Sequence, residues 1–230
     1  MFNDKSINNL SCSNIIECYG LPGSGKTYFS KIIFQKLNRL GFDVDSRSLS
    51  IIKMSYFTRA LFKVFLTFIS LVYSPKASIL FTNWIFKQQI TSKSQLIKIW
   101  VNGLCVIRLY NSNSAIKLID QGMIQIYWAI INHLKTQKHD LIDKNTGLKI
   151  LKSLYGQKNV CIINVNIPNN KHKANIKKRF NGNKTHIYNW EKSIKTQLRS
   201  KAKIDDLVQN LIVPKSLIQT INILNQDLSE

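Results

Sequence analysis

The sequence predicts an α/β protein in three layers, with a parallel sheet covered by helices on both faces. Short apolar runs alternate along the chain with longer segments whose apolar residues recur at helical spacing. This alternation of strand and helix is typical of the crossover units that build parallel sheets. The length of 230 residues and the hydrophobic content of 44% suit a single domain, residues 1–230, and exclude a disordered chain.

The first elements are a strand and an amphipathic helix. Residues 14–19 form a short apolar run, which predicts a buried strand. In residues 26–40 the apolar side chains fall on one helical face, and Gly41 supplies the stop signal. A second strand is predicted over residues 42–49.

The rest of the chain continues the alternation. Residues 53–110 are predicted to form a mainly helical insertion, with breaks near Ser74 and Thr91. The later elements are strands over 115–119 and 159–167, and helices over 127–134, 144–155, 204–212 and 217–228. A fifth strand, expected in many sheets of this kind, is not evident near the C-terminus.

The most hydrophobic stretch, residues 56–73, has two interpretations. Arg59 and Lys63 interrupt it, and the uninterrupted remainder, residues 64–73, is too short to cross a bilayer. One interpretation is a buried or half-buried helix. The other is a helix lying on a membrane surface, because such helices combine basic residues with Phe and Leu.

The charge balance indicates an anionic partner. There are 33 Lys and Arg against 12 Asp and Glu, a formal net charge of +21, which favours nucleotides, nucleic acid or a membrane surface. The lysines are scattered and no nucleic-acid-binding signature occurs, so nucleic acid is the least favoured of these. The acids are sparse: between Asp45 and Asp140 the only one is Asp120.

The first 13 residues contain no apolar stretch of the length that a secretory signal needs. This predicts a cytoplasmic protein, located at the inner face of the membrane if residues 56–73 bind lipid.

One motif carries specific chemistry. Residues 20–27, GLPGSGKT, fit G-x-x-x-x-G-K-[ST], a loop whose backbone N–H groups cradle phosphates at the start of a helix. Lys26 is expected to reach the β- and γ-phosphates and the Thr27 hydroxyl to bind Mg²⁺. The predicted nucleotide-binding residues are Gly20, Leu21, Pro22, Gly23, Ser24, Gly25, Lys26, Thr27 and Tyr28.

Residues 15–41 resemble the start of P-loop small-molecule kinases, the group that includes thymidylate, shikimate and adenylylsulfate kinases. The run that ends in Asp120-Gln121-Gly122, followed by a helix, is similar to a segment of P-loop proteins often found with bacterial surface-polysaccharide genes. The resemblance implies a P-loop NTPase fold, ATP and Mg²⁺ as cofactors, and phosphoryl transfer to a small acceptor.

Asp120 is the candidate carboxylate for Mg²⁺, together with Thr27. It ends an apolar strand in the acid-poor middle of the chain, although a turn or helix-cap aspartate is the alternative. Gln121 stands where a hydrolytic ATPase would usually have a glutamate, and glutamine cannot take a proton from water. This favours transfer to an acceptor over hydrolysis. The absence of an NKxD motif favours ATP over GTP.

The resemblance also implies residues on the acceptor side. Asp45 is the candidate base for the acceptor hydroxyl, with a solvated loop acid as the alternative. Arg47 and Arg59 are candidates for an anionic acceptor. In such kinases the segment corresponding to residues 169–188 is a mobile lid, and Arg179 is its candidate transition-state cation.

These observations predict an ATP-dependent kinase that phosphorylates an anionic or polyhydroxylated small molecule. A nucleotide-binding ATPase or regulatory switch without an acceptor is the alternative.

Overall fold

The computed structural model describes most of the chain. The described residues are 10–111, 115–134, 144–156, 158–166, 169–179, 194, 197–198, 200–206, 208–209 and 221–224.

A five-stranded sheet forms the centre of the molecule, and all its strand pairs are parallel. Its strands are β1 (Ile15–Tyr19), β2 (Val44–Asp45), β3 (Ile116–Ile119), β4 (Val160–Asn166) and β5 (Ile221–Leu224), in the spatial order β2-β3-β1-β4-β5. The central strand β1 pairs with β3 on one side and with β4 on the other, with Ile15 opposite Lys117 and Val160. The predicted α/β class with a parallel sheet is confirmed.

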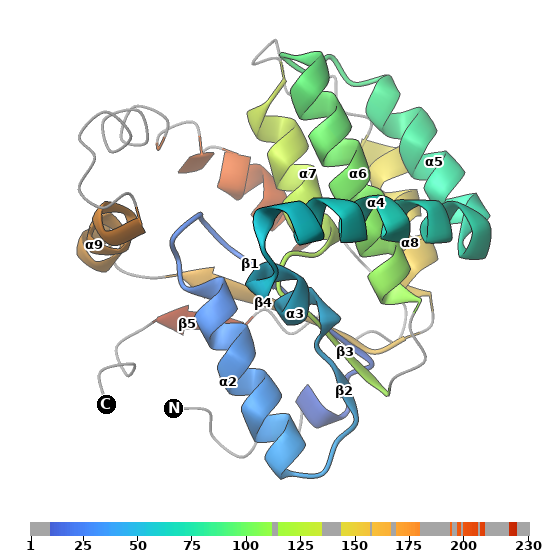
Figure 1. The fold of residues 1–230 in the computed structure, drawn as a ribbon. Helices are drawn as coiled ribbons and strands as arrows, with labels where there is room; N and C mark the ends of the chain where they lie inside the picture. The colour runs from blue at the N-terminus through green and yellow to red at the C-terminus, as the bar shows by residue number, and fades with distance from the viewer. Residues whose placement is uncertain are drawn as a thin grey trace.

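Helices pack against both faces of this sheet (Figure 1). The helices are α2 (Lys26–Arg39), α3 (Arg47–Lys53), α4 (Tyr56–Tyr73), α5 (Pro75–Phe86), α6 (Lys93–Tyr110), α7 (Met123–Asn132), α8 (Lys144–Tyr155) and α9 (Asn169–Arg179). Helix α2 covers one face, and the layer made by α5, α6, α7 and α8 covers the other. The predicted breaks near Ser74 and Thr91 separate α4, α5 and α6 as expected.

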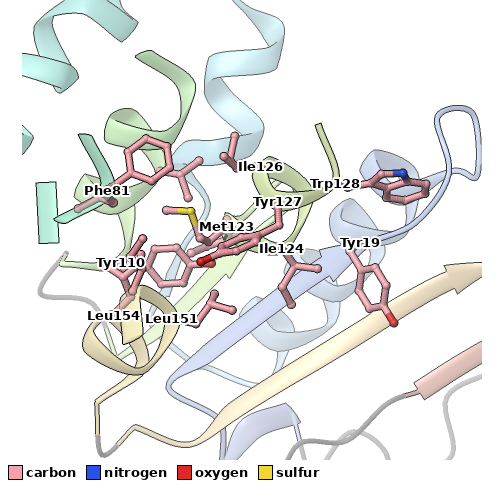
Figure 2. Close-up of a cluster of buried hydrophobic side chains, with 14 of the residues drawn as sticks. Tyr19, Phe81, Tyr110, Met123, Ile124, Ile126, Tyr127, Trp128, Leu151 and Leu154 are labelled. Atoms are coloured by element: carbon pink, nitrogen blue, oxygen red, sulfur yellow. Dashed lines mark hydrogen bonds between the residues drawn. The ribbon is translucent and has the colours of Figure 1, made fainter. Parts of the chain in front are cut away.

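The period of two along β1 explains why there are two hydrophobic cores. Ile16 and Cys18 point to the α2 side, where they join a buried cluster with Phe29 and Ile33. Ile15 and Tyr19 belong to the larger cluster on the opposite face. Figure 2 shows part of this larger cluster, in which aromatic side chains from several helices lie over the sheet.

The predicted second strand is too long. The structure has only Val44–Asp45 as a strand, and residues 47–49 belong to α3. The cause is local, because the Asp45 carboxylate accepts hydrogen bonds from both the backbone N–H and the side chain of Arg47. Such a side-chain bond to the backbone two residues on ends the strand and starts the helix.

The predicted helix over 217–228 is also wrong where the chain is described. Residues 221–224 form strand β5, which pairs in parallel with β4. The Ile-Asn-Ile-Leu sequence suits a strand, and pairing with an existing sheet edge decides the outcome. This is the fifth strand that the sequence did not reveal.

Candidate functional site

The glycine-rich loop follows β1, the strand at which the strand order of the sheet reverses. Strands β2 and β3 lie on one side of β1, and β4 and β5 on the other. In open parallel sheets, ligands bind outside the carboxyl ends of the strands at such a switch point. Residues 20–25 leave the carboxyl end of β1 and lead directly into α2, as the sequence predicted.

Glycine is required at two positions of this loop for different reasons. A Cβ on Gly20 would lie 2.4 Å from the Val165 carbonyl oxygen, so the loop can follow β4 closely only without a side chain. Gly25 has φ +87° and is the N-cap of α2, a left-handed conformation that other residues rarely adopt. Among the described residues, no atom outside the loop's own neighbours lies within 4 Å of a Cβ placed on Gly25, so they leave this side of the loop open.

The interior of the loop offers donors to an anion. The Lys26 ammonium group donates to the carbonyl oxygens of Gly20, at 2.8 Å, and Leu21, at 3.0 Å, so it lies along the loop. The Ser24 hydroxyl is buried, and the described residues give it no hydrogen-bond partner. A buried hydroxyl without a partner is unfavourable by about 1–3 kcal/mol, and a phosphate oxygen would satisfy it. These residues therefore fit a phosphate group.

Thr27 and Asp120, 93 positions apart in the sequence, meet beside this loop. The Thr27 hydroxyl donates to Asp120 Oδ2 at 2.8 Å, and the Ser30 hydroxyl donates to Oδ1 at 3.2 Å. Asp120 is fully buried at the end of β3. The structure thus brings the two predicted metal ligands together, and Ser30 is a partner that the sequence analysis missed. Its spacing from Thr27, one helical turn, was the available signal.

The Thr27–Asp120 pair fits a magnesium ion. Among the described residues there is no group of three His, Cys, Asp or Glu side chains that could hold a metal. Mg²⁺ does not need one, because it is usually held by one or two carboxylates together with substrate phosphates and water. Thr27 Oγ1 and Asp120 Oδ2 are two adjacent oxygen atoms beside the glycine-rich loop that could bind such an ion.

Burial raises the pKa of Asp120 above its ordinary value of 3.8, and this outweighs the lowering by the Thr27 hydrogen bond and the Lys26 charge. Mg²⁺ binds the carboxylate form, so we expect magnesium-dependent ATP affinity to weaken as pH falls, starting above the range in which an exposed aspartate titrates. Calorimetric titration of ATP with and without Mg²⁺ between pH 8 and pH 5 measures this. The magnesium-free titration is the control. A magnesium-dependent component that stays constant over this range would contradict the assignment.

Two cavities meet next to this pair. The first, about 580 Å³, lies over the glycine-rich loop and is lined by Pro22, Gly23, Gly25, Lys26, Thr27, Tyr28, Gln121, Gln125, Asn175 and Lys178. The second, about 270 Å³, lies between the end of β3 and helices α3, α4, α6 and α7. Gln121 and Gln125 line both, and Asp120 lines the second. The buried Gln125 Oε1 has no hydrogen-bond partner among the described residues.

The second cavity contains residues that the sequence analysis did not select for it. Its polar lining includes Lys63 and Asn102, and the Lys63 ammonium donates to Asn102 Oδ1 at 2.7 Å. Burial lowers the pKa of Lys63. The remaining lining is mainly apolar, from Ile51, Val106, Leu109 and Ile126 among others. No local pattern indicates this pair, because α4 and α6 bring the two residues together from 39 positions apart.

Helix α9 lies against the glycine-rich loop. The His172 Nε2 atom is 2.6 Å from the Pro22 carbonyl oxygen, and the Asn175 amide donates to the Gly23 carbonyl at 3.0 Å. The buried Ile176 side chain packs against Gly23 so closely that a Cβ on Gly23 would lie 2.8 Å from Ile176 Cδ1.

These contacts bear on the predicted lid, residues 169–188. Its first part, residues 169–179, is helix α9, and the remainder lies outside the described residues. The Arg179 side chain is also outside the described part, whereas Lys178 lines the first cavity. Among the described side chains of α9, Lys178 is therefore the cation that lines the cavity over the glycine-rich loop.

The other acceptor-side candidates lie elsewhere. Asp45 forms an ion pair with Arg47 at 2.6 Å, and neither residue lines the two cavities. Arg59 donates to the Met54 carbonyl at 2.8 Å. The structure does not bring Asp45 to Asp120, so no described contact supports its role as the base.

A buried glutamate holds the turn that follows Asp120. Glu17, fully buried on β1, accepts hydrogen bonds from the hydroxyl groups of Tyr110 and Tyr155 and, at 2.8 Å, from the Ile124 N–H. A Cβ on Gly122 would lie 2.2 Å from the Glu17 carboxyl carbon. Glu17 therefore fixes the N-terminus of α7, and with it the Asp120–Gly122 turn, against β1.

Comparison with known proteins gives no match: no protein-family model, no curated protein and no solved structure matches this chain.

Proposed function

We propose that the protein is a P-loop phosphotransferase that moves the γ-phosphoryl group of ATP to a small acceptor. The glycine-rich loop at the switch point of the sheet, the Lys26 ammonium and the buried Ser24 hydroxyl support binding of the triphosphate. The Thr27–Asp120 pair supports binding of Mg²⁺, which would supply charge neutralisation at the β- and γ-phosphate oxygens.

The observation that carries the proposal is the pair of adjoining cavities. A nucleotide in the first cavity and an acceptor in the second would meet beside Asp120, Gln121 and Gln125. Phosphoryl transfer depends mainly on holding the two reactants in line, so two sites that meet at the magnesium ligand suit this reaction. A pure ATPase or a regulatory switch has no need of the second cavity.

The lining of the second cavity indicates the acceptor class. At about 270 Å³ it suits a small molecule, and the Lys63 ammonium with the Asn102 amide offers polar partners for an anionic or hydroxyl group. The apolar remainder suits a carbon skeleton rather than a second triphosphate. Lys178, and Arg179 by the resemblance to P-loop kinases, would neutralise charge on the transferring phosphate.

A metabolite screen tests the proposal. Thermal unfolding is measured for each compound with and without ATP·Mg²⁺, since a true acceptor should add to the stabilisation by the nucleotide. Compounds that do so are then tested for transfer of labelled γ-phosphate. Rapid ATP hydrolysis without any acceptor, unchanged by every compound, would contradict the kinase and support the ATPase or switch.

Replacing Lys63 with methionine tests the assignment of the second cavity. We expect KM for the acceptor to rise by about 10-fold or more, with the affinity for ATP·Mg²⁺ unchanged, because the charged head is lost and the apolar stem is kept. Steady-state kinetics and nucleotide titration measure the two quantities. Lys98→Met, which changes an exposed lysine on α6, is the matched control. Equal loss of ATP affinity in Lys63→Met would contradict the division into two sites.

A further inference from the structure

Helix α4 exposes most of its large apolar side chains, whereas two of its three buried residues are the small polar Thr67 and Ser70. The exposed fraction is 70% for Phe57, 59% for Phe65, 65% for Phe68 and 73% for Val72. These residues recur at helical spacing and form one face with Leu61, Val64 and Leu71, here called the α4 outer face. Soluble proteins rarely leave such a continuous apolar face uncovered, so it indicates an interaction site.

Hydrogen bonds on the inner side fix this orientation. Leu66, Thr67 and Ser70 are the buried residues of α4, which is described in full. The Thr67 hydroxyl lies 3.4 Å from the Val101 carbonyl oxygen on α6, and the Ser70 hydroxyl lies 2.9 Å from that of Ser78 on α5. Rotating α4 to bury its phenylalanines would break these contacts with α6 and α5, so the apolar face is held outward.

The position of α4 argues against a membrane-spanning role. By length and composition alone it is the one described helix that could span a bilayer, which is weak evidence by itself. It packs across α6 at the outside of the helical layer (Figure 1). A helix held in this way by its neighbour can lie in the plane of a surface but cannot cross a bilayer without leaving the fold.

The charged residues of α4, and of the helices α3, α5 and α6 that contact it, are all positive. No Asp or Glu occurs between Ser46 and Ile119. Lys53 precedes the helix and Arg59 lies in its first turns, while Lys76 follows its end and Arg108 lies over the Tyr73 ring, 5.4 Å from its centroid. Cations therefore flank both ends of the apolar face, an arrangement that suits lipid phosphates around an acyl layer.

We propose that α4 docks the protein onto the surface of a bilayer that contains anionic lipid. The α4 outer face enters the boundary between headgroups and acyl chains, and the flanking Lys and Arg side chains bind headgroup phosphates. A second copy of this chain fits the face less well, because pairing two such regions would bring together cations with no carboxylate to neutralise them.

Vesicle sedimentation tests this. The 230-residue chain is mixed with vesicles of phosphatidylcholine alone or of phosphatidylcholine with phosphatidylglycerol. We expect binding to the mixed vesicles that weakens with added salt, and at least about a 10-fold lower partition coefficient for the triple variant Phe57→Ser, Phe65→Ser, Phe68→Ser. Leu40→Ser, which changes an exposed leucine beyond α2, is the matched control and should bind like the wild type.

A second readout does not depend on the triple variant folding normally. Phe65→Cys, in a Cys12→Ser background, is labelled with an environment-sensitive dye, since the other cysteines are buried. We expect the emission to shift to the blue with mixed vesicles. No shift, or equal sedimentation of wild type and triple variant, would overturn the proposal. So would a wild-type dimer in light scattering that the triple variant lacks, combined with no vesicle binding.

Discussion

Replacing Asp120 with asparagine is expected to remove the magnesium-dependent part of nucleotide binding and to lower phosphoryl transfer by at least about 100-fold. Asparagine keeps the shape of the side chain and one oxygen, but it loses the negative charge that Mg²⁺ requires. The same change should leave the stability of the protein without ligand unchanged or higher, because burial disfavours the charged form of Asp120.

Thermal unfolding with ATP, with and without Mg²⁺, separates these two effects. In the wild type Mg²⁺ should add to the stabilisation by ATP, whereas in Asp120→Asn it should add nothing. Asp43→Asn, a change at an exposed acid just before β2, is the matched control. Full magnesium-dependent stabilisation in Asp120→Asn would contradict the magnesium-binding role of Asp120. It would indicate that Asp120 only stabilises the turn after β3.

Replacing Glu17 with alanine is expected to lower the free energy of unfolding by about 3–5 kcal/mol. The change leaves two buried tyrosine hydroxyls and the Ile124 N–H without their shared acceptor, and it creates a void between β1 and α7. Equilibrium unfolding in urea measures this loss. A loss below about 1 kcal/mol would show that the network has little energetic weight.

Glu17→Gln is the informative control, because it keeps an acceptor oxygen in the same place. Burial raises the pKa of Glu17 above its ordinary value of 4.5, so the folded protein holds this proton at pH values where the unfolded chain releases it. The contribution of Glu17 to stability is therefore greatest below pH 4.5 and declines as pH rises toward the folded-state pKa. Glu17→Gln should remove this part of the pH dependence and be less destabilising than alanine.

Helices, strands and loops that depend on residues close together in the sequence could be predicted from the sequence. The first strand, the glycine-rich loop, α2 and the breaks between α4, α5 and α6 all depend on neighbouring residues. The meeting of Thr27 with Asp120 was also foreseeable, because an apolar strand that ends in the region's only carboxylate belongs at the same edge of a parallel sheet as the loop.

The features that were missed depend on contacts between distant parts of the chain. Strand β5 exists through its pairing with β4, and α9 lies on the loop through His172 and Asn175. The outward face of α4 could not be distinguished from a core face, because its apolar spacing is the same in both cases. Buried Thr67 and Ser70 decide which side faces the protein.

The hydrogen bonds of Glu17 also affect when the turn after Asp120 can be fixed during synthesis of the chain. The glycine-rich loop leaves the ribosome before Tyr110 and Tyr155, yet the Glu17 carboxyl group beside the loop is hydrogen-bonded to both of these later residues. A nascent chain that ends before residue 155 would carry the loop but lack one donor that fixes the turn after Asp120. The proposed binding of magnesium with nucleotide should therefore emerge late and abruptly as the chain lengthens, when α8 packs against β1.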